Sequence, residues 1–192
     1  MSFPARIVFL TRSLNYGGSE RQLVALVIGL HHDGQSTAVA TFYPGGPFQH
    51  SLESAGVPVF SLGKHSRWDV VGFAWRLIRF VRRAKPDILH GYLGTANILA
   101  VWLKPFCPGM KVIWGVRASN MELERYGWLD RLLYWIECRL SQCADVIIVN
   151  SHVGLEYAVS HGFPREKMIV IANGIDTERF HPNRQARTRF RG

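Results

Sequence analysis

The chain has 192 residues, a formal net charge of +9 and a hydrophobic content of 47%, with 12% aromatic residues. This length suits one domain with a sizeable core, and this composition excludes an intrinsically disordered chain. No apolar run approaches the roughly 20 residues that a membrane-spanning helix needs, and the first residues lack the pattern of a signal peptide.

Short apolar runs alternate with amphipathic segments along the whole sequence. The runs predicted to be strands are 6–11, 37–42, 58–62, 87–90, 111–116, 145–150 and 168–172. The segments predicted to be helices are 19–32, 48–55, 69–84, 94–105, 127–143 and 152–161. Most runs are continuously apolar, as in parallel strands that are covered on both faces. We therefore expect an α/β fold, a Rossmann-like, doubly wound, mostly parallel sheet of six to seven strands with helices on both faces.

The most regular helical pattern lies in 127–143. Its apolar residues recur at the spacing of one helix face and are Leu129, Leu132, Leu133, Ile136 and Leu140. Such a stripe is typical of an amphipathic helix.

Polar or glycine-rich residues follow the predicted strands. They are Arg12 after the first strand, Tyr92 after the fourth, Arg117 and Asn120 after the fifth, Ser151 after the sixth, and Asn173 and Gly174 after the last. In open α/β sheets, ligands bind beyond the carboxyl ends of the strands. These cations, amides and hydroxyls predict a site for an anionic, hydroxyl-rich ligand.

Gly17 and Gly18 open the first predicted helix in the segment GGSER. Their backbone amides could approach a phosphate at the helix N-terminus. Alternatively, they form a tight turn before a capping box in which Ser19 bonds the amide of Gln22. The segment matches neither GxGxxG nor the P-loop pattern.

His90 and Arg117 are the titratable candidates at strand ends. His90 could be an acid/base or phosphate ligand, or a half-buried histidine bonded to the backbone. Tyr92 could donate its hydroxyl to a substrate or pack in the core. Arg117 directly follows a buried strand and must pair with an acidic side chain or with a ligand phosphate, because an unpaired buried charge is costly.

Residues 64–111 hold nine basic and two acidic side chains. Within the helix predicted there, Trp75 lies among four arginines, which are Arg76, Arg79, Arg82 and Arg83. The pattern fits either a solvated amphipathic helix or contact with an anionic membrane surface. No nucleic-acid-binding motif accompanies the charge, so we expect no nucleic acid partner.

The three cysteines, Cys107, Cys138 and Cys143, follow no ligand or disulfide pattern. They indicate reduced thiols in a cytoplasmic protein, which the basic helix could hold peripherally at the inner face of the membrane. No DxD, HExxH or CxxC motif occurs, and we expect neither a metal nor another cofactor.

The strand at 168–172 stops at a turn dipeptide, Asn173-Gly174, and only ten residues follow Pro182. We expect residues 1–175 to form one domain. Residues 176–192 would be an interdomain linker or the start of a further domain.

Four segments together resemble the N-terminal half of family-4-type retaining glycosyltransferases with the GT-B fold. They are GGSER (17–21), PDILHGYLGTAN (86–97), CADVIIVNS (143–151) and KMIVIANGIDTERFHP (167–182). The resemblance implies an acceptor-side domain that faces a donor-binding domain across a cleft. Many relatives carry H-x-H where this chain has His90-Gly91-Tyr92, so Tyr92 stands where the second histidine would be.

The resemblance implies roles for the loop residues. Arg12, Gly17, Gly18, Asn173 and Gly174 would approach the donor or a phosphate. Tyr92, Arg117, Asn120 and Ser151 would line the acceptor side, and His90 and Tyr92 are weak catalytic candidates.

The implied function is transfer of a hexose from a nucleotide-diphosphate sugar, as a substrate, to a lipid-linked or saccharide acceptor in glycan or polysaccharide biosynthesis. We expect this chain to be inactive without a C-terminal domain. The alternatives are a non-catalytic module that binds a membrane surface or a partner, and half of a sugar-nucleotide epimerase.

Overall fold

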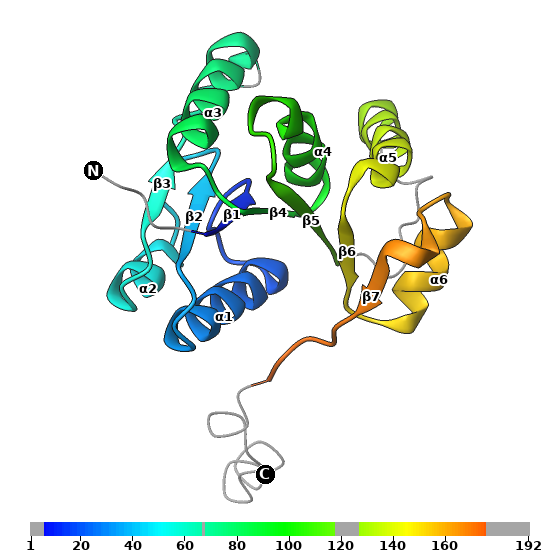
Figure 1. Cartoon of the computed structure of the whole chain (residues 1–192), viewed down its shortest axis with the longest axis horizontal. Helices are drawn as coiled ribbons and strands as arrows, with labels where there is room; N and C mark the ends of the chain where they lie inside the picture. The colour runs from blue at the N-terminus through cyan, green and yellow to red at the C-terminus, as the bar shows by residue number, and fades with distance from the viewer. Residues whose placement is uncertain (1–5, 67, 118–126, 176–192) are drawn as a thin grey trace, which may run out of the picture.

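The computed structural model describes residues 6–66, 68–117 and 127–175, in which strands and helices alternate (Figure 1). The strands are β1 (Ile7–Thr11), β2 (Thr37–Thr41), β3 (Val59–Ser61), β4 (Ile88–Tyr92), β5 (Lys111–Val116), β6 (Val146–Val149) and β7 (Met168–Val170). The α-helices are α1 (Gly18–His32), α2 (Gln49–Ser54), α3 (Val70–Ala84), α4 (Gly94–Trp102), α5 (Trp128–Leu140) and α6 (His152–Ser160). Short 3-10 helices are η1 (Lys104–Phe106), η3 (Ser141–Cys143) and η4 (Arg165–Lys167).

The strands form one seven-stranded sheet in the order β3-β2-β1-β4-β5-β6-β7, and every neighbouring pair is parallel. The predicted fold class is confirmed. The direction of winding reverses between β1 and β4, which is the topological switch point of a doubly wound sheet. Because the sheet is parallel, all strands end at one edge, which we call the carboxyl edge.

Helices cover both faces of the sheet, so the strands are buried on two sides. In Figure 1, α1 and α2 lie on one side, and α3, α4 and α5 lie on the other. One core cluster contains Leu23 and Val27 of α1, and a larger one contains Leu77 of α3 and Ala100 of α4. This two-sided burial explains why the strand sequences are continuously apolar rather than alternating. No helix in the described part of the chain has the length and apolar character to cross a membrane.

Helix α5 has an orientation that its sequence pattern does not predict. Leu129 and Leu132, from the apolar stripe, are 51% and 43% exposed, and Glu137 is buried. The stripe identifies the helix correctly but is only partly its buried face, since Leu133, Ile136 and Leu140 are half-buried and Leu140 packs against the larger core cluster. The carboxylate of Glu137 turns inward because Asn97 of α4 donates a hydrogen bond to it.

Helix α4 packs closely on β4 through Gly91. A Cβ at Gly91 would lie 2.8 Å from the carbonyl oxygen of Ala96 and 2.8 Å from the Cα of Asn97. Both neighbours are backbone atoms, which cannot rotate away. Leu93, which joins β4 to α4, has a φ of 70°, a backbone conformation that is costly for a branched side chain.

The close approach of α4 predicts that Gly91→Ala lowers the free energy of unfolding by about 1–3 kcal/mol. Gly29→Ala in α1 is the matched control, since nothing lies within 4 Å of its new Cβ. This control should raise stability by about 0.5–1 kcal/mol through the better helix propensity of alanine. Urea denaturation of both variants measures the difference, and equal stabilities would contradict the packing described here.

Candidate functional site

The carboxyl edge brings together residues from distant parts of the chain. Arg117 follows β5 and donates a hydrogen bond from Nη1 to Oδ1 of Asn173, which follows β7, at 2.6 Å. Gln22 of α1 donates from Nε2 to the carbonyl oxygen of Gly174 at 3.0 Å. The loops after β5 and β7 and the first turns of α1 therefore meet at one place, as parallel pairing requires.

Arg117 stacks on a tyrosine from β4. Its Cζ atom lies 5.1 Å from the centre of the Tyr92 ring, which is only 1% exposed. A guanidinium over an aromatic face is a favourable cation–π arrangement. Arg117 is thus held on one side by Tyr92 and on the other by Asn173. No acidic side chain bonds it among the described residues, so its positive charge is available to an anion.

Three polar atoms around this arginine have no hydrogen-bond partner in the described protein. They are Nε2 of His90, Oη of Tyr92 and Nε of Arg117. A buried polar atom that lacks a partner costs about 1–3 kcal/mol. Proteins retain such unpartnered atoms where the atoms bind a ligand. Three of these atoms at one edge of the sheet therefore mark a candidate binding site.

His90 is a buried, neutral imidazole. Burial, together with the smaller effect of the Arg117 charge, lowers its pKa from 6.5 to about 3. The ring packs 5.0 Å from Phe9 and 5.9 Å from Tyr92, centre to centre. His90 therefore carries no positive charge near neutral pH. It can exchange hydrogen bonds but is not a cationic phosphate ligand, and at 4% exposure it is more deeply buried than the half-buried histidine of the alternative prediction.

Tyr92 keeps its proton for the same reason. Burial raises the pKa of its hydroxyl, and the cation of Arg117 opposes that rise. The hydroxyl is a donor at any physiological pH. Gly115 of β5 leaves the room for this ring, because a Cβ there would lie 3.0 Å from Cδ2 of Tyr92 and 3.1 Å from Nε2 of His90.

The N-terminus of α1 differs from the predicted capping box. Gly17 is the N-cap in an extended conformation, with no side-chain cap, and Ser19 lies inside the helix. The carboxylate of Glu20 folds back over Gly17, where a Cβ would collide with it. An acidic group there is stabilised by the helix dipole, so a phosphate approaching Gly17 would have to displace it. Gly18 has no atom within 4 Å of a virtual Cβ and leaves the backbone open.

The remaining predicted site residues are placed less centrally. Arg12 is exposed and lies over the ring of Tyr43, with 5.9 Å from its Cζ to the ring centre. The hydroxyl of Ser151 accepts a hydrogen bond from the amide of Gly154 at 3.0 Å and caps α6. Ser151 therefore has a structural role that the sequence prediction did not include. Asn120 lies outside the described residues.

A buried polar pair behind Arg117 was missed by the sequence analysis. Asn97 donates from Nδ2 to Oε1 of Glu137 at 2.9 Å and lies 3.4 Å from the carbonyl oxygen of Gly115. The pair links α4, α5 and β5. Beside it lies a cavity of about 220 Å³ lined by Leu93, Val116, Arg117, Tyr134, Glu137 and Phe163, among others. An acidic residue within a helical pattern reads as solvent-facing, so no sequence signal identifies this pair.

Within the described ranges, no group of three His, Cys, Asp or Glu side chains is arranged to hold a metal ion. The site contributes a guanidinium, a phenol hydroxyl, side-chain amides and backbone amides. These groups are donors, and they suit an oxygen-rich anion.

The burial of Glu137 predicts a pH-dependent stability. Burial raises the pKa of its carboxyl above 4.5, and the hydrogen bond from Asn97 opposes that shift. The folded state then holds the proton at pH values where the unfolded chain releases it, so the wild type loses stability as pH rises through this range. In Glu137→Gln, which keeps the acceptor for Asn97, this loss should vanish.

We expect Glu137→Gln to become more stable relative to the wild type as pH rises from 5 to 8. Urea denaturation measures the free energy of unfolding of both proteins. Glu53→Gln on the exposed surface of α2 controls for the loss of one acidic group. If the difference in unfolding free energy between Glu137→Gln and the wild type does not change with pH, the buried environment assigned to the Glu137 carboxyl is contradicted.

The fold has clear counterparts among known proteins. The family described as glycosyl transferase 4-like domain matches residues 17–174. HepE from Anabaena, solved with UDP, has a TM-score of 0.77 at 16% identity, over 97% of this chain and 49% of that one. The lipopolysaccharide outer core galactosyltransferase WaaB gives a TM-score of 0.67 at 10% identity, over 88% of this chain and 46% of its own.

A third structure, the UDP-GlcNAc 2-epimerase from Methanocaldococcus jannaschii, gives a TM-score of 0.60 at 10% identity, over 87% of this chain and 45% of its own. Comparison with curated protein sequences gives no match. The chain spans about half the length of the structures it matches. With most of its length matched by the family, this chain belongs to the glycosyl transferase 4-like domains and has the fold of the N-terminal half of a GT-B glycosyltransferase.

Proposed function

We propose that this chain is the acceptor-side domain of a retaining glycosyltransferase. The enzyme would move a hexose from a nucleotide-diphosphate sugar to a lipid-linked or saccharide acceptor in glycan or polysaccharide biosynthesis. Residues 1–175 would form this domain, and residues 176–192 would lead into a donor-binding domain. No metal or other cofactor is part of the proposal.

The observation that carries the proposal is the position of Arg117 between Tyr92 and Asn173. It places a cation, a protonated hydroxyl and an amide at the carboxyl edge, and no acidic side chain in residues 6–66, 68–117 and 127–175 pairs with the cation. Glycosyl transfer from a diphosphate donor develops negative charge on the leaving phosphate, and fixed donors lower the energy of that state. HepE was solved with UDP and also with UDP-glucose, which supports a nucleotide-sugar ligand.

The roles within the site follow from position. Gly17, Gly18 and the Asn173-Gly174 turn would approach the donor diphosphate, with Arg12 at the periphery. Tyr92 and Arg117 would orient the acceptor, together with Asn120 and Ser151, and the guanidinium of Arg117 would also bind a phosphate of the donor. Orientation of this kind contributes to rate because it fixes the reacting atoms before the chemical step. His90 would support Tyr92 as a neutral neighbour rather than transfer a proton.

A transition state assembled between two domains needs both for its stabilisation. We therefore propose that the 192-residue chain alone binds nucleotide-sugars weakly, with a dissociation constant on the order of 1 mM, and does not transfer sugar.

A second candidate is the sugar-nucleotide epimerase, which the similarity to UDP-GlcNAc 2-epimerase structures favours. Both activities use the same donor class, so donor binding does not separate them. Product analysis does, because a transferase yields a glycosylated acceptor and an epimerase yields an altered nucleotide-sugar.

The test is saturation-transfer NMR with uridine- and guanosine-diphosphate sugars, together with a radiolabelled transfer assay. Arg117→Gln should weaken the binding of the preferred nucleotide-sugar by about 10-fold or more, because it removes a charge-assisted hydrogen bond to phosphate. Arg82→Gln, an exposed arginine near the C-terminus of α3, is the matched control and should bind as the wild type does.

Unchanged affinity in Arg117→Gln would overturn the assigned site. Micromolar donor binding or sugar transfer by the 192-residue chain would refute the proposed need for a second domain.

A further inference from the structure

Helix α5 turns two tryptophans toward solvent. Trp128 and Trp135 are 76% and 56% exposed, whereas Glu137 on the same helix is 8% exposed. At 3.6 residues per turn, Trp128, Leu132, Trp135 and Arg139 fall within an arc of about 60°. We call this arc the α5 outer face. Apolar residues on the inner side, among them Leu133, Ile136 and Leu140, are half-buried, so α5 carries apolar side chains on both its inner and its outer side.

Arginines accompany the tryptophans on this helix. The Cζ atom of Arg139 lies 5.3 Å from the ring centre of Trp135, and Arg131 flanks the same arc. Asp130, the acidic residue of the first turn, lies on the opposite side of the helix from Trp128. The α5 outer face thus combines large aromatic rings with cations and no acidic group.

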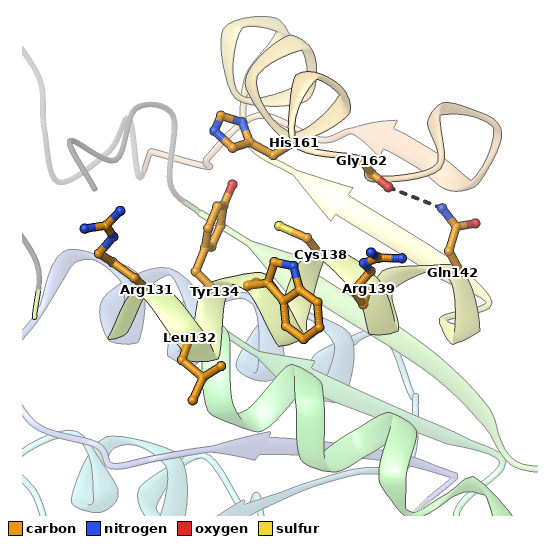
Figure 2. A pocket seen from close by; sticks show the side chains of 9 residues that line it. Arg131, Leu132, Tyr134, Cys138, Arg139, Gln142, His161 and Gly162 are labelled. Carbon is orange, nitrogen blue, oxygen red and sulfur yellow. Dashed lines mark hydrogen bonds between the residues drawn. The ribbon is translucent and has the colours of Figure 1, made fainter. Parts of the chain in front are cut away.

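A groove of about 750 Å³ runs beside the α5 outer face. Figure 2 shows Arg131 and Arg139 on the α5 wall, with His161 and Gly162 across from them. Gln142 closes one end by donating a hydrogen bond to the carbonyl oxygen of Gly162 at 3.2 Å. The groove offers room beside the rings for a headgroup-sized, anionic group.

Exposed tryptophans occur throughout the helical layer that contains α3, α4 and α5. Five of the six tryptophans are exposed, at 42% to 81%, and they are Trp68, Trp75, Trp102, Trp128 and Trp135. They precede or lie on these three helices, which share one side of the sheet in Figure 1. Tryptophan is usually well buried in globular proteins, so this distribution marks an interaction surface.

Helix α3 repeats the pairing of ring and cation. The Cζ atom of Arg79 lies 5.1 Å from the ring centre of Trp75, and Arg82 and Arg83 are exposed nearby. Arg76, by contrast, bonds the carbonyl oxygens of Leu62 and Gly63 at 2.8 and 3.0 Å and also pairs with Asp69. The expectation that Arg76 faces a membrane is therefore wrong, since its guanidinium is held within the protein.

We propose that the α3–α4–α5 layer, centred on the α5 outer face, docks on an anionic lipid surface. Tryptophan and arginine together are the residues that settle at a membrane–water interface, with rings at the headgroup level and cations beside lipid phosphates. The exposed rings extend over three neighbouring helices, which fits a broad lipid surface better than a single peptide groove.

The position of the last described segment supports this assignment over an intramolecular one. Gly174 is bonded to Gln22 of α1, and α1 lies on the other side of the sheet. This segment therefore leads away from the layer that carries the tryptophans. None of the tryptophans and arginines that carry this proposal has a role in the candidate site around Arg117 and Asn173, so the proposal stands independently of the proposed transferase activity.

The test is co-sedimentation of the 192-residue chain with phosphatidylcholine vesicles, with and without about 30% phosphatidylglycerol, at low and high salt. We expect binding to the anionic vesicles that weakens as salt rises. Trp128→Ala/Trp135→Ala should reduce this binding about 10-fold or more. Arg131→Gln/Arg139→Gln should reduce it at low salt and flatten the salt dependence. Arg21→Gln on the exposed surface of α1 is the control and should bind as the wild type does.

Circular dichroism establishes that each variant is folded, which we expect because the substituted side chains are exposed. No sedimentation of the wild type at low salt would overturn the proposal, as would equal binding of the tryptophan variant. Light scattering tests a third outcome, which is self-association of the chain. A wild-type dimer that Trp128→Ala/Trp135→Ala converts to monomer, without lipid binding, would assign the surface to self-association instead.

Discussion

Parallel pairing of all seven strands is the constraint on which the rest of this structure depends. It requires a crossover after every strand, and these crossovers supply the helices that bury both faces. It also places every strand end at one edge of the sheet. Arg117 and Asn173, which are 56 residues apart, can share a hydrogen bond only because β5 and β7 run in the same direction. The candidate site is therefore a consequence of topology rather than of a local motif.

The hydrogen bond between Asn97 and Glu137 connects the site to the outer surface. It turns the one acidic side of α5 inward, behind Arg117, and so directs Trp128 and Trp135 outward. A buried carboxyl with a single amide partner costs stability relative to an apolar contact. The pair gives no packing advantage in return, but it determines which face of α5 is exposed to solvent or to a membrane.

The sequence predicts the fold well because continuous apolar runs and turn residues are local signals of parallel strands. It also locates the loops of the site, since those loops follow the strands. It does not predict that Leu129 and Leu132 are exposed while Glu137 is buried, because helical periodicity identifies an apolar stripe without identifying which neighbours cover each part of it. The capping of α1 by Gly17 instead of Ser19, and the engagement of Arg76 by carbonyl oxygens, depend equally on neighbours that are distant in sequence.

We propose that the carboxyl edge around Arg117 binds a nucleotide-sugar. The most direct measurement is a titration of the ¹⁵N-labelled chain with UDP-glucose, followed by amide chemical shifts. We expect the largest changes in amide chemical shift at Gly17, Gly18, Arg117 and Asn173, while the amides of Trp128 to Arg139 on α5 change little. Shifts that cluster on α5 or α3 and leave Arg117 and Asn173 unchanged would contradict it.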